Sequence, residues 1–469
     1  MSRGRALLGL LTFALIVVAP SSGASAAKFT GTWRGTFSLP TSIPFSVQVA
    51  GKRVTVTLPA GHPAPVTVAA HISGDRLHFA LPGRPTSLAF DGHLRAGKYT
   101  GKVKQAGVLG TFALRRGKAL ETAGLGVYRL DSGHAISVTV PGGSPLLVDY
   151  DANEIHGVYG NVVGAALGVR DPAAGSVRFA RNAIDLSLNG ATSHGVRVAA
   201  HELELRLRSG GAMLAGTLTL PDTPGRHPAV VMVHGSGPTP RTDGSVFTAY
   251  FVSRGFVVLT YDKRGIGQSG GRYPGEGASP ANVDAYAHDA EAAARLLAEQ
   301  PEVDRNRVGL SGASQAGWIM PLAASREQAV KFLVLVSGPT VTEGEQREYQ
   351  NLTTSGATTP TQSPAEILAA VRQAGPSGFD PLPSIRRLTI PALWLSGEID
   401  QHVPTVLSAE RLAPVAREPG RDFTFDVFPG ADHFLIESAH GLTSEALRSN
   451  RYAVGLFATL DRWLRARGL

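Results

Sequence analysis

The hydrophobic pattern of the chain changes near Val196. Before this residue, apolar and polar side chains alternate with a period of two, most clearly over residues 54–58 and 77–81. Such alternation places the apolar side chains on one face of a β-sheet and the polar side chains on the other. The first part of the chain is therefore expected to be all-β.

This β-rich part is expected to form two units. Residues 27–118 predict a small antiparallel β domain in which Gly-Asp and Asp-Gly pairs mark turns. Residues 119–195 continue in short β segments interrupted by Gly and Pro, and they predict a second β module or an extension of the first. Neither stretch holds a recognisable catalytic set, which favours a scaffold over a substrate-binding accessory domain.

After Val196, short and fully apolar segments alternate with helical patterns. Residues 229–233 and 256–260 are typical of buried strands, and residues 282–299 carry apolar side chains along one helical face. This alternation predicts an α/β fold over residues 196–469: a mostly parallel, doubly wound sheet with helices on both faces. In such sheets, ligands bind at the loops that follow the carboxyl ends of the strands.

Two serines compete for the role of nucleophile. Ser269 lies in Gly267-Gln-Ser-Gly-Gly271, which matches Gly-x-Ser-x-Gly letter for letter, but no helical pattern follows it. Ser314 lies in Gly312-Ala-Ser-Gln-Ala316, between a predicted strand and a predicted helix. A sharp strand–turn–helix connection exposes the serine hydroxyl beside a helix N-terminus, which favours developing negative charge. This context favours Ser314 over Ser269, and over Ser311, which lies on the strand side of the turn.

A serine hydroxyl is a weak nucleophile without a base. His433 follows a strand-like segment, and Asp400 lies just beyond another predicted strand. The chain order Ser314, Asp400, His433 matches one known order of catalytic triads. His433 would take the serine proton as general base, and Asp400 would hold the imidazole in the required tautomer. The alternatives are Glu398 or Asp432 as the carboxylate and His402 as the base.

The negative charge that develops on a substrate carbonyl also needs hydrogen-bond donors. Residues 234–237 follow the first buried strand of the α/β part, where backbone N–H groups can point into a site. We expect the backbone N–H groups of Ser236 and Gln315 to form this oxyanion hole.

Five motifs between residues 196 and 469 together resemble the α/β-hydrolase superfamily. The similarity is strongest to its secreted bacterial esterase, dienelactone-hydrolase-like and prolyl-oligopeptidase-like branches. The resemblance implies that residues 262–269 form a structural loop, which is a second argument against Ser269. Ala316 departs from the family pattern, which has Gly at this position. The motifs are His234-Gly-Ser-Gly-Pro238, Asp262-Lys-Arg-Gly-Ile-Gly-Gln-Ser269, Gly312-Ala-Ser-Gln-Ala316, Gly397-Glu-Ile-Asp-Gln-His-Val-Pro404 and Gly430-Ala-Asp-His433.

A Thr-, Gly- and Pro-rich stretch interrupts the α/β alternation at about residues 341–385. It follows a core strand and contains one helical piece near residues 365–373. Its position is similar to that of the insertion that caps many hydrolases, so we expect a small cap that limits substrate size. An unstructured excursion is the alternative.

Composition excludes several chemistries. The 469 residues include no cysteine, so a disulfide framework, a thiol nucleophile and a thiolate metal site are excluded. No cluster of residues has zinc-ligand spacing and no phosphate-binding loop occurs, so we expect neither a metal nor a cofactor. The formal net charge is +8, but the 45 Lys and Arg residues are scattered without a long basic run. This pattern is typical of a soluble surface rather than of a nucleic-acid-binding protein.

The first 26 residues are typical of a secretory signal peptide. Arg3 and Arg5 precede an apolar stretch over residues 6–19, and Ala24-Ser-Ala26 supplies the small residues of a cleavage site. The apolar stretch is shorter than the ~20 residues that span a bilayer. We therefore expect cleavage after Ala26 rather than an uncleaved anchor, no later membrane span, and a secreted or periplasmic protein.

These features predict a secreted serine hydrolase that cleaves small-molecule carboxylic esters through an acyl-enzyme intermediate. A serine peptidase with the same triad is the alternative enzyme, because the resembling families include both. A surface-binding protein with an inactive hydrolase core is the alternative outside enzymes. If the N-terminal β region is a binding domain rather than a scaffold, the cell envelope or a polysaccharide is the partner we expect for it.

Overall fold

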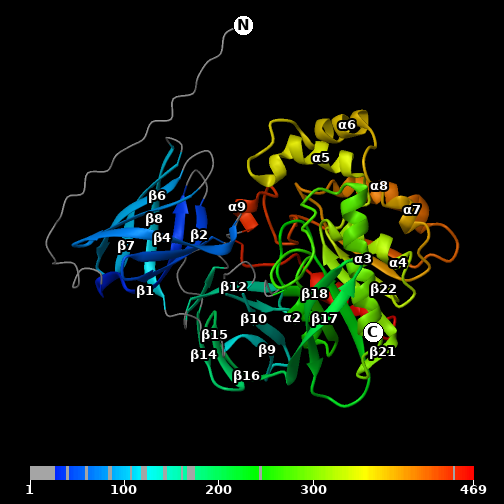
Figure 1. Cartoon of the computed structure of the whole chain (residues 1–469), viewed down its shortest axis with the longest axis horizontal. Coiled ribbons are helices and arrows are strands. Elements are labelled where there is room, and N and C mark those ends of the chain that lie inside the picture. Colours follow the sequence, from blue (N-terminus) through cyan, green and yellow to red (C-terminus); the bar gives the residue numbers. More distant parts are fainter. Residues whose placement is uncertain are drawn as a thin grey trace, which may run out of the picture.

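The computed structural model describes residues 27–38, 42–58, 62–82, 87–105, 108–117, 124–140, 145–159, 162–165, 175–241, 246–446 and 449–469. The predicted signal peptide, residues 1–26, lies outside the described residues. Two β-barrels precede a mixed sheet that carries helices (Figure 1). The predicted fold class, an all-β region followed by a mostly parallel α/β sheet, is confirmed. No helix in the described part of the chain is long and apolar enough to cross a membrane.

The first barrel is antiparallel and closes because its last strand pairs with its first. Alternate residues of each strand point inward, and large aromatic side chains such as Trp33, Phe90 and Tyr99 fill the interior. The strands are β1 (Gly31–Ser38), β2 (Ser42–Ala50), β3 (Arg53–Leu58), β4 (His62–Ser73), β5 (Arg76–Leu81), β6 (Leu88–Arg95), β7 (Lys98–Gln105) and β8 (Val108–Gly117).

A second closed barrel follows, and it packs against the α/β part. Its own interior holds residues such as Tyr128 and Ile136. Other side chains, among them Tyr150, belong to a core shared with the α/β part, where the Tyr150 hydroxyl donates to the carbonyl of Val246 at 2.9 Å. The strands are β9 (Gly126–Leu130), β10 (Ala135–Thr139), β11 (Leu146–Asp149), β12 (Glu154–Tyr159), β13 (Val162–Ala165), β14 (Gly175–Phe179), β15 (Ala183–Leu188) and β16 (Ala191–Arg197).

The α/β part is built on an eight-stranded sheet with the order β17-β18-β20-β19-β21-β22-β23-β24. Only β18 runs antiparallel to its neighbours, and every other pairing is parallel. The strands are β17 (Ala200–Ser209), β18 (Ala212–Pro221), β19 (His227–Val233), β20 (Val257–Tyr261), β21 (Val303–Ala313), β22 (Phe332–Val336), β23 (Ala392–Gly397) and β24 (Phe423–Phe428).

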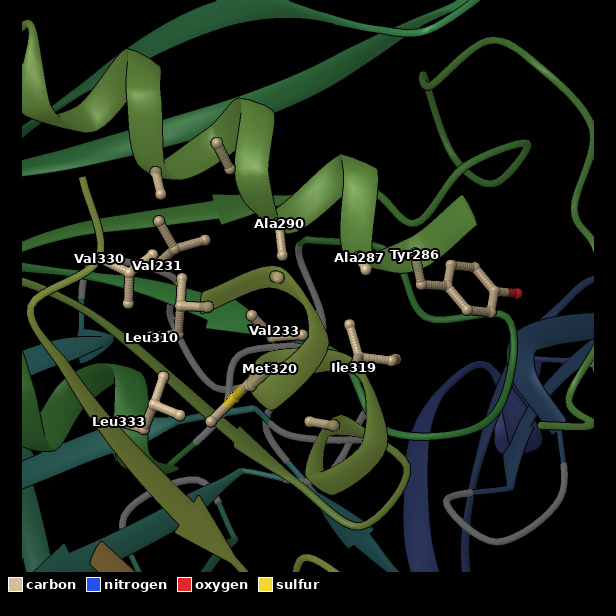
Figure 2. Close-up of a cluster of buried hydrophobic side chains, with 14 of the residues drawn as sticks. Val231, Val233, Tyr286, Ala287, Ala290, Leu310, Ile319, Met320, Val330 and Leu333 are labelled. Atoms are coloured by element: carbon tan, nitrogen blue, oxygen red, sulfur yellow. The ribbon is translucent and has the colours of Figure 1, made fainter. Parts of the chain in front are cut away.

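Helices cover both faces of this sheet because its central strands are apolar on both sides. On one face, small residues such as Ala287 and Ala290 of α3 (Pro280–Ala298) let the helix approach Val231 and Leu310 closely, with α4 (Ala316–Ala324) beside it (Figure 2). The same face carries α7 (Leu382–Ile385) and α8 (Thr405–Ala416). On the opposite face lie α2 (Val246–Ser253), α10 (Leu456–Arg465) and the second barrel.

The segment between β22 and β23 is helical over much of its length. It contains α5 (Glu343–Thr353), a 3-10 turn η3 (Thr354–Gly356) and α6 (Pro364–Ala374), followed by α7. Capping boxes begin both long helices: Thr342 pairs with Glu345, and Ser363 pairs with Glu366. The short helix α9 (Thr443–Ala446) lies later in the chain, in the loop region before α10.

Candidate active site

Ser314 occupies a strained turn at the carboxyl end of the sheet. It lies between β21 and α4 and has a left-handed backbone with φ of +56°. A non-glycine residue in this conformation costs free energy and persists only where the surrounding structure holds it. Here the Ser314 N–H donates to the carbonyl of Val336 on the neighbouring strand at 3.0 Å.

Small residues allow this turn to form. A Cβ atom on Gly312 would lie 2.4 Å from the carbonyl oxygen of Val233, and one on Gly317 would lie 2.6 Å from the backbone of Pro339. Ala316, which departs from the Gly-x-Ser-x-Gly pattern, is the first residue of α4 and is fully buried. It therefore has helical geometry, and the position does not require glycine.

The structure places the two competing serines in different surroundings. The Ser269 hydroxyl donates to the Asp262 carbonyl at 2.7 Å and accepts the Ala215 N–H at 2.9 Å, so it is engaged in holding the loop. Ser311 is fully buried and lines a cavity of about 160 Å³ beside Gly235 and Ala313. Of these three serines, Ser314 is the one that lies in a left-handed turn between a strand and a helix.

His433 and Asp400 form a hydrogen-bonded pair. The imidazole Nδ1 lies 2.8 Å from Oδ2 of Asp400, whose side chain is fully buried. The other carboxylate oxygen of Asp400 accepts the N–H groups of His402 and Val403 at 2.7 and 2.9 Å. Burial lowers the pKa of His433, but the charge and hydrogen bond of Asp400 outweigh it, and the net shift is upward.

The three alternative residues have other contacts. Glu398 accepts the N–H of Gly430, and one oxygen of Asp432 accepts the N–H groups of Phe434 and Ile436. His402 stacks on His433 with ring centroids 4.5 Å apart. Burial, followed by the nearby charge of His433, lowers the pKa of His402 to about 4.

Ser314 and His433 both form hydrogen bonds with residues at the end of β22. The carbonyl of Val336 accepts the N–H of Ser314, and the hydroxyl of the next residue, Ser337, donates to the carbonyl of His433 at 2.8 Å. Ser337 is buried and also has a positive φ, of +47°. The sequence carries only one signal for Ser337, its position at the end of a buried strand.

The loop after β19 lies directly against the turn that holds Ser314. A Cβ atom on Gly235 would come within 3.6 Å of the Ser314 Cβ. Among the described residues, no acceptor is found for the backbone N–H of Ser236 or of Gln315. His234 donates from Nε2 to the carbonyl of Tyr261, and burial lowers its pKa to about 4.

A buried lysine, which sequence analysis did not single out, joins these segments. Lys263 is 1% exposed, and its ammonium donates to the carbonyls of Gly235 and Gly237 at 2.7 and 3.2 Å. It also donates to the side-chain oxygen of Gln315 at 3.1 Å, and it lies 4.3 Å from the ring centroid of Tyr286. The only signal was its place inside the Asp262–Ser269 motif.

Helix α5 forms hydrogen bonds with the loop that carries Asp400. The Tyr349 hydroxyl donates to the Asp400 carbonyl at 2.7 Å, and the Thr353 hydroxyl donates to the Gln401 carbonyl at 2.6 Å. The segment between β22 and β23 therefore contacts the site directly. No group of three or more metal-ligating side chains occurs within the described ranges.

Comparison with known proteins agrees with this architecture. Residues 244–459 match the model of the prolyl oligopeptidase family. An uncharacterised protein of Pseudomonas aeruginosa is 33% identical over 126 residues, which cover 26% of this chain and 33% of that protein. An uncharacterised 31.7 kDa protein of Escherichia coli is 29% identical over 142 residues, which cover 29% of this chain and 48% of that protein. The matches thus span about a third and about half of these two relatives.

An esterase of Pyrococcus furiosus is among the similar solved structures. It is 16% identical, with a TM-score of 0.42 over 57% of this chain and 92% of that chain. The strand order, the turn at Ser314 and the family match define the class of the domain after the second barrel. This part of the chain has the α/β-hydrolase fold.

Proposed function

We propose that the protein is a serine hydrolase that cleaves small-molecule carboxylic esters, with Ser314, His433 and Asp400 as its catalytic triad. The observation that carries the proposal is the 2.8 Å pair of His433 and Asp400 at the same sheet edge as the strained Ser314. A turn with this geometry exposes a serine hydroxyl at the N-terminus of a helix. A carboxylate-bound imidazole is the base that such a hydroxyl requires.

In the first half of the reaction, the Ser314 hydroxyl attacks the ester carbonyl while His433 Nε2 takes its proton. Asp400 stabilises the imidazolium that forms. The tetrahedral intermediate collapses to an acyl-enzyme as His433 returns the proton to the leaving alcohol. Water then attacks the acyl group with His433 again as base, which releases the acid and restores Ser314.

The negative oxygen of each tetrahedral intermediate is stabilised by the backbone N–H groups of Ser236 and Gln315. Because the Gly235 carbonyl points at Lys263, the Ser236 N–H on the other side of that planar peptide points away from Lys263. Gln315 follows the nucleophile and precedes α4, where a helix N-terminus favours negative charge.

A serine peptidase is the second candidate, supported by the match of residues 244–459 to the prolyl oligopeptidase family model. The same triad and oxyanion donors would serve an amide substrate. The two candidates differ in leaving group, so turnover of matched acyl esters and aminoacyl amides separates them.

A labelling experiment tests the triad. Wild type, Ser314→Ala and Ser269→Ala are treated with a fluorophosphonate, and intact mass is measured. One adduct on wild type and Ser269→Ala, but none on Ser314→Ala, is expected. If folded wild-type protein takes up no adduct, the triad is not active and the surface-binding alternative becomes the better description.

We also propose that the protein is exported and that its signal peptide is cleaved after Ala26. Arg3, Arg5 and the apolar stretch of residues 6–19 support this proposal. N-terminal sequencing of protein recovered from the medium or periplasm should begin at Ala27. A chain that retains residues 1–26 in the membrane fraction would contradict it.

A further inference from the structure

The net positive charge of this protein resides in its first barrel. Residues 31–117 contain 11 Lys and Arg but only two acidic residues, Asp75 and Asp91. The other residues contain 34 Lys and Arg and 35 Asp and Glu, so they are close to neutral as a whole. This asymmetry is not visible as a basic run, because the cations are spread along the strands and turns.

The up-and-down topology gathers these cations at one end of the barrel. The β2–β3, β4–β5 and β6–β7 turns lie at the same end as the start of β1 and the end of β8. Seven exposed cations lie there, and we refer to them as the basic end. They are Lys52, Arg53, Arg76, Arg95, Lys98, Arg115 and Arg116.

Several of these cations lie directly beside one another. Lys98 is the cross-strand partner of Arg95 on one side and of Arg115 on the other, and Arg115 is opposite Arg34. Arg95, Lys98 and Arg115 thus form one row of cations across β6, β7 and β8, whereas Arg34 on β1 donates to the carbonyl of Val158 at 3.2 Å. At the usual strand spacing this row is about 10 Å long. Like charges in directly opposite positions repel one another and destabilise a sheet, so an anion bound along the row would relieve the repulsion.

Few acidic groups neutralise the basic end. Asp75 contacts His93 at 3.1 Å and Arg95 at 3.9 Å, and Asp91 pairs with Arg76. Within the described part of the chain, Lys52, Arg53, Lys98 and Arg115 form no ion pair. These four cations are available to an external anion.

The surroundings of the basic end indicate the kind of anion. The aromatic side chains of the barrel are buried in its interior, so the described surface offers no stacking platform for nucleotide bases. The exposed large apolar side chains of the barrel, Val108 and Leu109, lie at the opposite end, so the basic end has no apolar anchor for a bilayer. A hydrophilic polymer with repeated negative charges fits these features best.

We propose that the basic end of the first barrel binds an acidic polysaccharide. Cations on three neighbouring strands, β6, β7 and β8, contact successive negative groups of the polymer, and binding is predominantly electrostatic. It therefore weakens as salt concentration rises. The proposal does not depend on the catalytic triad, because the barrel holds none of the triad residues.

The test uses the full-length mature chain and immobilised polygalacturonate, with neutral dextran as the control polymer. The quadruple variant Lys52→Glu, Arg53→Glu, Lys98→Glu, Arg115→Glu is compared with a matched variant of equal charge change. The matched variant carries Arg181→Glu, Arg226→Glu, Arg305→Glu and Arg417→Glu, four exposed positions outside the first barrel. Wild type and the matched variant should bind polygalacturonate at low salt, and the quadruple variant should bind at least about tenfold more weakly.

Circular dichroism and thermal unfolding verify that each variant is folded. If the quadruple Glu variant does not fold, the corresponding Gln variant replaces it, with the matched positions also changed to Gln. Equal binding by wild type and the folded quadruple variant would overturn the proposal, as would equal loss in the matched variant. Tighter binding to duplex DNA or to phosphatidylglycerol vesicles than to polygalacturonate would also overturn it, and would assign the basic end to that partner instead.

Discussion

The ammonium group of Lys263 lies 2.7 Å from the carbonyl oxygen of Gly235, and the lysine side chain is almost completely buried. Its other acceptors are the Gly237 carbonyl and the Gln315 side chain, and all three acceptors are uncharged. One buried cation thus links the two segments that we assign to the oxyanion hole. We expect Lys263 to be a positioning residue, which sets the orientation of the donors without touching the substrate.

Lys263→Met should lower kcat strongly and change KM little. The substitution keeps the length of the side chain but removes three hydrogen bonds that hold the loop and Gln315 in place. Loss of one oxyanion donor typically costs a factor of about 100 in kcat, and we expect an effect between about tenfold and that value. Steady-state kinetics on a p-nitrophenyl ester measures it.

Arg264→Met is the matched control for this variant. Arg264 is the next residue of the same loop and pairs with the buried carboxylate of Asp289, so its loss should lower the melting temperature. Within the described residues, the hydrogen bonds of Arg264 go to Asp289, Ser209 and Ala285, and none goes to Gly235 or Gln315. An equal fall of kcat in both variants would mean that Lys263 acts only through general stability.

Activity should decline above about pH 8. Burial lowers the pKa of Lys263 to about 8, although attraction from Glu276 and Asp289 opposes this shift. Deprotonation of Lys263 weakens its hydrogen bond to the Gly235 carbonyl, so kcat should fall at alkaline pH. This alkaline limb should be absent in Lys263→Met. The unfolded chain keeps this proton up to about pH 10.5, so between these values the Lys263 contribution to folding stability rises with pH. Falling activity without falling stability would therefore distinguish this titration from alkaline unfolding.

The acidic limb of the pH–rate profile should have an apparent pKa above the ordinary value of a histidine. Burial alone would lower the pKa of His433, but the charge and hydrogen bond of Asp400 outweigh it. Because only neutral His433 can accept the serine proton, kcat/KM should rise as pH passes this value. In Asp400→Asn the limb should move to lower pH and the rate should fall. Glu398→Gln should leave the limb in place, since Glu398 binds the Gly430 N–H instead.

Ser314→Gly should be more stable than Ser314→Ala by about 1 kcal/mol. Both variants lack the hydroxyl and should be inactive, but only Ala retains a Cβ atom in the left-handed conformation at φ of +56°. Thermal unfolding of the two proteins measures the difference. Ala316→Gly is the control: Ala316 is helical, so removal of its Cβ should not stabilise the protein. Equal stability of the two Ser314 variants would show that the turn relaxes without the hydroxyl.

Local sequence was sufficient to predict the strand–turn–helix connection at Ser314. Ser314 is preceded by an apolar strand and followed by a helical pattern, and both features can be read within a dozen residues. Asp400 and His433 each follow a strand, and parallel strands bring such positions to one edge of the sheet. The structure pairs these two side chains at 2.8 Å. The fold class was accessible for the same reason, because hydrophobic periodicity is a local property.

Long-range contacts could not be predicted from local sequence. The acceptors of Lys263 come from residues 235, 237 and 315, which no spacing rule connects with residue 263. Helix α5 has few apolar residues, so no hydrophobic periodicity predicts it. Its hydrogen bond to the Asp400 loop depends on how the segment between β22 and β23 folds back onto the sheet edge. Whether residues 119–195 formed an independent unit depended on the pairing of β16 with β9, which closes a second barrel.

The charge of the first barrel shows most clearly which properties the sequence determines and which depend on the tertiary structure. The sequence by itself determined that residues 31–117 hold 11 cations and two acids, although their scattered positions suggested a dispersed surface. Only the tertiary structure decided that seven of them meet at one end, because barrel closure aligns turns that are more than 20 residues apart along the chain. The candidate active site follows the same rule. The sequence determines which side chains are present, but strand pairing and packing determine the distances between them.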